Sequence, residues 1–354
     1  MKIAVVLDLE GVLLPPGIDF AFMILEASTY NKEEIRKEVT DMLSTFDKFD
    51  DERWLYYKYV KGEPKYQTGT TPFYSLMLTT ALGVDKDVIS MLCEKILGIA
   101  RLDVAKKIID GIRELSDLVV IASSAYHEFV NKFLEKTNAK IDQVYATGNT
   151  ILDGVQNEDI IKELRELYTR EVLLKICELV YYYALICLKK SRYDIFEKLF
   201  KAAKVSNIEY VEKFLVNQRG VAGSLLKAQV VRKLREKGFF TIFVGDSVVD
   251  VDAAEVANIS ISINTSSRQL LNLTTFNVIT RDYTVLVDII RLIVTGKIWA
   301  LKEELRGRCE ILSRVEVSES LNRIAEINRK MRSLIASEIR EEFVRKVLQG
   351  STLT

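Results

Sequence analysis

Short apolar segments recur along the chain and alternate with longer segments of helical periodicity. Four short segments are rich in valine and isoleucine and are bounded by charged or turn-forming residues; they lie at 2–8, 117–123, 239–246 and 259–263. Each is too short for a stable helix, and such runs are typical of strands that a parallel sheet buries on both faces. Two further segments are weaker strand candidates: QVYATG at 143–148 and FNVIT at 276–280.

Helical patterns separate these predicted strands. Residues 103–115 precede the second strand and residues 225–238 precede the third, where Gly238 is placed to end the helix. Alternation of strand and helix predicts a doubly wound, Rossmann-like α/β fold with a parallel sheet. We expect this core to be assembled from three parts of the chain, residues 1–15, 101–149 and 221–298.

Three other segments are predicted to be helical. Residues 16–100 and 150–220 carry mainly helical periodicity, and we interpret both as insertions that lie over the edge of the sheet. Residues 299–354 form a helical tail. Between Ser318 and Leu348 its apolar residues mostly recur every three or four positions, which indicates an amphipathic helix. That helix packs on its own domain or, as an alternative, contacts a second copy or another protein.

Composition narrows the classes of partner. The 354 residues are 48% apolar, and 50 basic side chains balance 50 acidic ones, so the overall charge favours neither nucleic acid nor an anionic membrane surface. The most membrane-like segment, Val172–Leu188, is interrupted by Lys175 and Glu178 and is short for a span. With no secretion signal at the N-terminus, we expect a cytoplasmic protein. The 28% of charged residues and only four prolines are typical of heat-adapted proteins.

Reactive side chains stand where the predicted strands end. The ends of the first, second and third predicted strands carry carboxylates or a hydroxyl, and the helix before the third strand opens with a lysine. These residues are Asp8, Glu10, Ser123, Asp246, Asp250 and Lys227. In an open α/β sheet, ligands bind beyond the carboxyl ends of the strands. We therefore expect these side chains to form one cluster.

The sequences DLEGV, VVIASS, KAQVVRKLREKG and FVGDSVVD, in this order, resemble the motifs of the haloacid dehalogenase superfamily of phosphatases and phosphotransferases. The first motif, with glutamate as its second acid, is most similar to phosphoserine phosphatase-like enzymes that also act as homoserine phosphotransferases. An archaeal branch of that group would fit the composition. The resemblance covers the α/β core and leaves the insertions and the tail unexplained.

The resemblance implies a role for each acid. Asp8 would attack phosphorus and form an aspartyl-phosphate, and Glu10 would give a proton to the leaving oxygen and then activate water or an acceptor alcohol. Asp8, Asp246, Asp250 and the backbone carbonyl of Glu10 would hold Mg²⁺, which prefers hard oxygen ligands. The expected cofactor is therefore Mg²⁺.

The remaining predicted site residues would contact the substrate. Lys227 would supply positive charge to the transferring oxygens, with Lys213, Lys233 and Lys237 as alternatives, and Ser123 would donate a hydrogen bond to one of them. Ser124, Gly11 and Arg53 complete the predicted substrate-binding set. Gly11 lets the chain turn away after the acids, and Arg53 lies in an aromatic-rich segment that suits a lid.

The predicted function is Mg²⁺-dependent hydrolysis of a small phosphorylated metabolite. Phosphotransfer to an alcohol acceptor is the first alternative. A second alternative is an assembly or binding protein on the same fold that does no catalysis. A phosphoserine-like substrate is one candidate. Pro16 argues against serine specificity, because amino-acid-specific relatives carry an ammonium-binding acid in that position and Asp19 is the nearest acid here.

Overall fold

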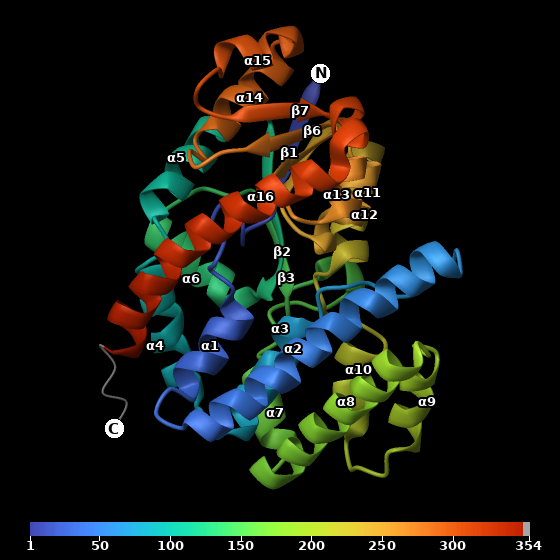
Figure 1. Cartoon of the computed structure of the whole chain (residues 1–354). Coiled ribbons are helices and arrows are strands. Elements are labelled where there is room, and N and C mark those ends of the chain that lie inside the picture. The colour runs from blue at the N-terminus through green and yellow to red at the C-terminus, as the bar shows by residue number, and fades with distance from the viewer. Residues whose placement is uncertain (350–354) are drawn as a thin grey trace.

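A seven-stranded sheet, flanked by helices, occupies one half of the protein (Figure 1). The computed structural model describes residues 1–349, so residues 350–354 of the predicted tail lie outside the described part. The strand order is β3-β2-β1-β4-β5-β6-β7, and every neighbouring pair is parallel except β6 and β7. The predicted α/β fold with a largely parallel sheet is confirmed.

Six of the seven strands are those expected from the apolar pattern. They are β1 (Lys2–Leu7), β2 (Leu118–Tyr126), β3 (Gln143–Thr147), β4 (Phe239–Gly245), β5 (Ile259–Ile263) and β6 (Phe276–Ile279). The seventh, β7 (Glu310–Ser313), lies in the tail that was predicted to be helical throughout, and that prediction is wrong there. Four residues with one buried side chain carry little pattern, and β7 is defined by its antiparallel backbone pairing with the edge of β6.

The rest of the regular structure in the described chain is mainly α-helical. The first half contributes α1 (Phe20–Ser28), α2 (Glu33–Leu55), α3 (Thr71–Ala81), α4 (Lys86–Leu97), α5 (Leu102–Arg113), α6 (His127–Thr137) and α7 (Ile160–Leu167). The second half contributes α8 (Arg170–Lys190), α9 (Ile195–Ala202), α10 (Ile208–Leu215), α11 (Ser224–Glu236), α12 (Val251–Val256), α13 (Arg268–Leu273), α14 (Val285–Val294), α15 (Leu301–Glu304) and α16 (Arg314–Phe343).

The two faces of the sheet bury different helices. Along β1, Val5 and Leu7 belong to the large apolar core that includes α5 and α14, whereas Ala4 and Val6 belong to a second core with α11 and α12. Successive side chains of a strand point to opposite faces, so a continuous apolar run supplies both cores at once. This is the physical reason why β1 could be recognised from its sequence.

The predicted helical insertions lie together at the carboxyl edge of the sheet. Helices α1 to α3 and α7 to α10 form the lower half of the molecule in Figure 1, with α2 and α3 both packed on α8. The N-terminus and the start of β1 lie at the end of the sheet that is farthest from these helices. β1 and the strands parallel to it therefore run toward this helical layer. Any site at the carboxyl edge is therefore covered by it.

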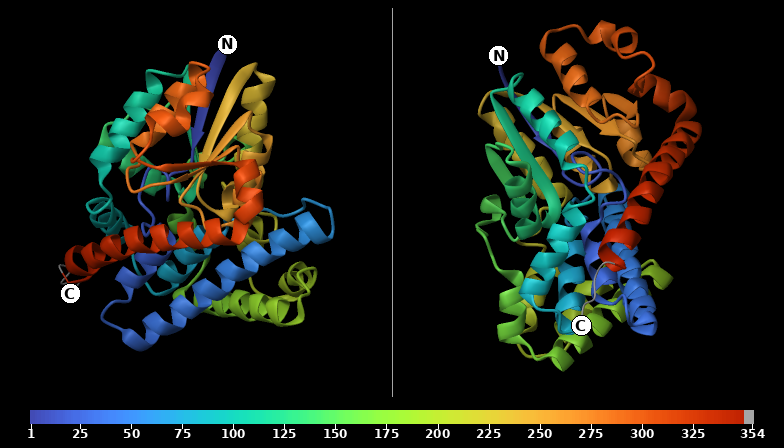
Figure 2. Two further views of the ribbon diagram at one scale, coloured as in Figure 1. Left: turned by 45° about the horizontal axis from the view of Figure 1, so that its top comes forward. Right: turned by 90° about the vertical axis from the view of Figure 1, so that its left-hand side faces the viewer.

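Helix α16 joins the two halves. Its first part packs on α13 through Val317, Ile324 and Ala325, and its later part reaches α1, where Arg340 pairs with Glu26 (Figure 2). Ser320 has non-helical angles, which marks a kink. None of the helices within residues 1–349 has the length and apolar character needed to cross a membrane.

Candidate active site

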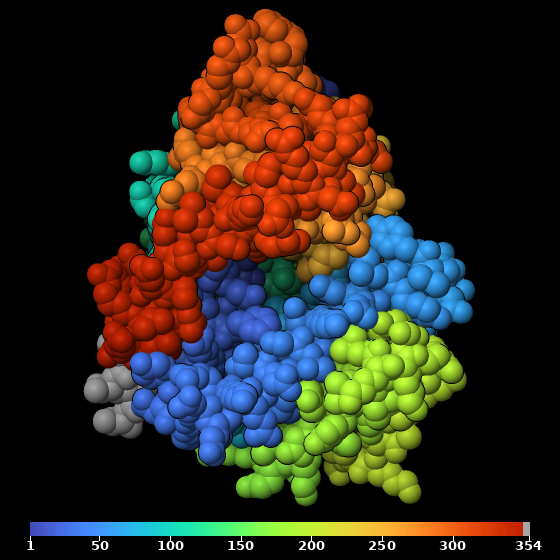
Figure 3. Space-filling model, in the orientation of Figure 1, coloured from blue at the N-terminus to red at the C-terminus, as the bar shows by residue number. Residues whose placement is uncertain are grey.

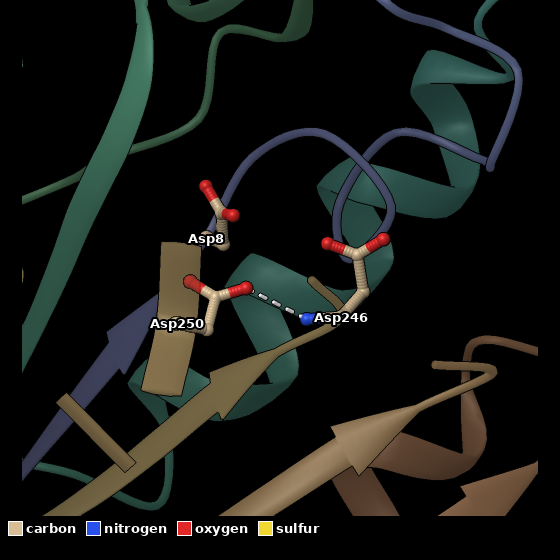
Figure 4. A group of neighbouring side chains, drawn as sticks. All are labelled: Asp8, Asp246 and Asp250. Atoms are coloured by element: carbon tan, nitrogen blue, oxygen red, sulfur yellow. Dashed lines mark hydrogen bonds between the residues drawn. The ribbon is translucent and has the colours of Figure 1, made fainter. Parts of the chain in front are cut away.

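Three aspartates converge beyond β1 and β4, the two central strands of the sheet. Asp8 follows the last residue of β1, Asp246 follows the last residue of β4, and Asp250 comes one short helical turn later (Figure 4). One carboxylate oxygen of each lies within 4.8 Å of the others, and all three side chains are buried. Hard oxygen ligands at this spacing suit a divalent cation such as Mg²⁺.

Lys227 is the cation that holds this group in place. Its ammonium lies 2.8 Å from Asp8 Oδ2 and 2.8 Å from Asp250 Oδ1, and its side chain is fully buried. Of the alternative lysines, Lys213 pairs with Glu158, and Lys233 and Lys237 are exposed. The structure therefore brings Lys227, and none of the three alternatives, to the aspartates.

Backbone groups and glycines fix the carboxylates. Asp250 Oδ2 accepts hydrogen bonds from the backbone N–H of Asp246 at 2.9 Å and of Ser247 at 3.0 Å. Gly11 has φ of +79°, and a Cβ there would lie 2.0 Å from Asp246 Oδ2. Gly11 thus acts by its missing side chain, since any other residue would displace Asp246. The predicted contact between Gly11 and the substrate stays a prediction.

Glu10 lies in the turn after β1 and lines a cavity beside the aspartates. Its Oε1 accepts a hydrogen bond of 2.6 Å from the backbone N–H of Phe20, the first residue of α1, while Asp19 caps that helix. Its side chain is not one of the three clustered carboxylates. The backbone carbonyl of Glu10 stays a predicted ligand only.

A cavity of about 430 Å³ opens beside the cluster and is lined by two of the three aspartates, Asp8 and Asp246. Figure 3 shows a hollow between α16 (red) and α2 (blue), which flank it on opposite sides. Six carboxyl side chains line the cavity: Asp8, Glu10, Asp19, Asp47, Asp51 and Asp246. Asp47 and Asp51 come from α2 and were missed from the sequence, although their spacing of four places them on one face of the helix.

The cavity carries more negative charge than its cations balance. Burial, together with the charges of Asp250 and Asp246, raises the pKa of Asp8 to about 8 even though Lys227 opposes the shift. Burial and nearby acids also raise the pKa of Glu10, Asp19 and Asp246. A divalent cation among the carboxylates would relieve this repulsion, so the donor set fits Mg²⁺ by its charge as well as by its oxygens.

Asp47 provides a test of this electrostatic picture. Burial first, and then the charges of Asp19 and Asp50, raise its pKa from 3.8 to about 6, while a hydrogen bond from Thr71 opposes the shift. A carboxyl whose folded-state pKa is raised costs stability above that pKa and costs none below its unfolded value. Asp47→Asn should therefore increase the free energy of unfolding by up to about 3 kcal/mol at pH 8 and by less than about 1 kcal/mol at pH 4.

Urea denaturation at the two pH values measures this difference. Asp41→Asn is the matched control, because Asp41 is an exposed acid on the same helix that accepts a hydrogen bond from Tyr181. A gain in the Asp47→Asn variant that is equal at pH 4 and pH 8 would contradict the raised pKa of Asp47.

Arg332 is a cavity residue that the sequence did not reveal. It projects from α16, lines the cavity and forms an ion pair with Asp246. Its side chain is 34% exposed, whereas Asp246 is 3% exposed. No local motif surrounds Arg332 in the sequence, and its position depends on how the tail helix crosses the sheet edge.

The two predicted serines differ in their surroundings. Ser123 is fully buried, and its Oγ accepts a hydrogen bond of 3.2 Å from the backbone N–H of Ala125. Ser124 lines the cavity, and Ser123 does not. Neighbouring residues of a strand point to opposite sides, so only one of the two can face the site.

Arg53 is not a cavity residue, and its predicted place in the substrate site needs correction. Its guanidinium is buried, pairs with Asp50 at 3.1 Å and donates to the carbonyl of Leu215 at 3.2 Å. It also lies over the ring of Tyr66 at 4.7 Å. Arg53 therefore joins α2 to α10, because a buried guanidinium requires such partners.

Comparison with a solved archaeal structure supports the fold. The chain is similar to the structure of a gene product from Archaeoglobus fulgidus, with a TM-score of 0.68 and 19% identity over 95% of this chain and 97% of that one. A protein of unknown function from Bordetella pertussis matches at a TM-score of 0.40 and 13% identity, over 75% of this chain and 92% of the other. No family model and no curated protein gives a significant match to the sequence.

Proposed function

We propose that the chain is a Mg²⁺-dependent phosphohydrolase of the haloacid dehalogenase type that acts on a small phosphorylated metabolite. The observation that carries this proposal is the convergence of Asp8, Asp246 and Asp250 around buried Lys227 at the carboxyl edge of the sheet. The motif resemblance adds the reaction class. A lysine that served only to support the fold would not require three buried acids beside an open cavity that two of them line.

Two side chains would perform the bond-making steps. A carboxylate oxygen of Asp8 attacks phosphorus as the bond from phosphorus to the leaving oxygen breaks, and an aspartyl-phosphate results. Burial and the charge of Asp19 raise the pKa of Glu10, which favours the protonated form that a general acid needs. Glu10 then takes a proton from the water that releases phosphate and restores Asp8.

The other residues would position and balance charge. Asp8, Asp246 and Asp250 would hold Mg²⁺, and the bound cation supplies positive charge to the transferring oxygens. Lys227 keeps Asp8 and Asp250 oriented through its two 2.8 Å contacts. Ser124, which lines the cavity, takes the hydrogen-bonding role that was expected of Ser123.

Turnover of p-nitrophenyl phosphate and of a panel of phosphorylated metabolites tests the proposal. We expect phosphate release that requires Mg²⁺ and stops when the metal is chelated. Release of the alcohol or phenol without matching phosphate, once an acceptor alcohol is added, would identify phosphotransfer. Folded protein that turns over no member of the panel with Mg²⁺ would contradict an enzyme and favour the assembly-protein alternative.

A further inference from the structure

A second cavity of about 460 Å³ adjoins the first and differs from it in charge. The two share a wall made by Asp51, Asp246, Ser247, Val248 and Arg332. Beyond this wall the second cavity is lined by the start of α13 and by α16. Three arginines contribute to it: Arg268, Arg329 and Arg332.

These arginines are only partly neutralised. Arg329 pairs with Glu326 on its own helix, with the two side chains 57% and 46% exposed, a weak interaction in water. Arg332 pairs with Asp246, which is one of the carboxylates expected to hold the cation. Arg268 is exposed and has no ion-pair partner among residues 1–349. The cavity therefore offers guanidinium groups to an incoming anion.

The charges on either side of the shared wall are opposite. Asp19 and Asp47 line the first cavity alone, whereas Arg268 and Arg329 line the second alone. A substrate group with negative charge would be repelled by the first pair and attracted by the second. Guanidinium groups also match carboxylate and phosphate oxygens in geometry.

We infer that the substrate is a phosphoester with a second anionic group, which the cavity lined by Arg268, Arg329 and Arg332 binds while the phosphoryl group lies over Asp8. This inference rests on the proposed function for the identity of the first group. It assigns to the tail helix α16, and to α13, a role in choosing the substrate. Arg332 lies between the two groups because it lines both cavities.

Paired ligands that differ only in the second charge test the inference. Binding is measured by titration calorimetry with the full-length Asp8→Asn variant and Mg²⁺, so that turnover does not interfere. One pair is 3-phosphoglycerate and glycerol 3-phosphate, which differ by a carboxylate. The other is fructose 1,6-bisphosphate and fructose 6-phosphate, which differ by a phosphate.

We expect the doubly anionic member of at least one pair to bind about tenfold or more tightly than its partner, as hydrogen bonds to charged groups allow. Which pair shows the preference identifies carboxylate or phosphate as the second group. Arg268→Gln, added to the same protein, should reduce the preference to less than about threefold. Arg323→Gln should leave it unchanged, because Arg323 is an exposed residue of α16 that lines neither cavity.

Equal binding of both members in both pairs, or no binding of any of the four, overturns the inference. So does a preference that survives in both Arg268→Gln and Arg329→Gln. Turnover by the wild-type protein is measured separately on the same four compounds. If the charge preference is found but neither these compounds nor the metabolite panel is turned over, the anion site is retained and the phosphohydrolase is contradicted. If turnover is found without a charge preference, the phosphohydrolase is retained and the anion site is contradicted.

Discussion

Replacing Asp8 by asparagine is expected to abolish Mg²⁺-dependent phosphate release, with a loss of about 10³-fold or more in kcat. The amide of asparagine has nearly the same shape as the carboxylate, but it is a poor nucleophile and a weaker ligand for a hard cation. The backbone N–H of Leu9, 2.7 Å from Asp8 Oδ1, can still donate to the asparagine oxygen. The site should therefore keep its structure while it loses its chemistry.

Activity and metal response are measured on the same preparations. In the wild-type protein Mg²⁺ should raise the melting temperature, because a ligand that binds only the folded state stabilises it, and this increase should shrink in Asp8→Asn. Asp110→Asn is the control, since Asp110 is an exposed acid that pairs with Lys106. An Asp8→Asn variant that retained more than a tenth of wild-type turnover would exclude Asp8 as the nucleophile.

Replacing Lys227 by methionine is expected to lower the free energy of unfolding by about 3–5 kcal/mol, as well as to remove activity. The substitution leaves Asp8 and Asp250 buried without the ammonium that contacts both. Breaking one side of a buried ion pair costs far more than the pair contributes, because the remaining charges stay desolvated. The loss should be partly restored when the pH is lowered enough to protonate Asp8, because burial and the neighbouring acids already raise the pKa of this carboxyl.

Urea denaturation without metal measures this effect, and Lys233→Met on the same helix is the matched control. Lys233 is exposed, so its substitution should change the free energy of unfolding by less than about 0.5 kcal/mol. A Lys227→Met variant as stable as that control would show that Lys227 does not compensate the buried acids. It would then also weaken the assignment of Lys227 as the residue that orients Asp8 and Asp250.

The central part of the site could be located from the sequence because local rules determine it. Apolar runs too short for helices identified β1 and β4, and in a parallel sheet their carboxyl ends meet at one edge. Asp8 and Asp246 directly follow those ends, so their proximity followed from the fold class alone. Lys227 could be located only with the help of the motif resemblance, which placed it at the start of the helix before β4.

Other residues could not be placed in this way because their environment depends on distant segments. Arg53 lies in an aromatic-rich stretch that suits a lid, yet Asp50 and the carbonyl of Leu215 hold it in the interior. Ser123 and Ser124 are adjacent in the sequence, and only the orientation of β2 decides which of them faces the cavity. Strand β7 is likewise defined by its partner strand rather than by its own pattern.

The sequence by itself determined the α/β fold, the two central strands and the acids that end them, since periodicity and strand-end position are local properties. The tertiary structure alone decided that Asp47 and Asp51 of α2 line the cavity and that Arg332 of α16 reaches Asp246. The ion pair between Arg332 and Asp246 joins residues 86 positions apart in the chain. Such a contact is created by helix packing across the sheet edge, and no segment of the sequence encodes it alone.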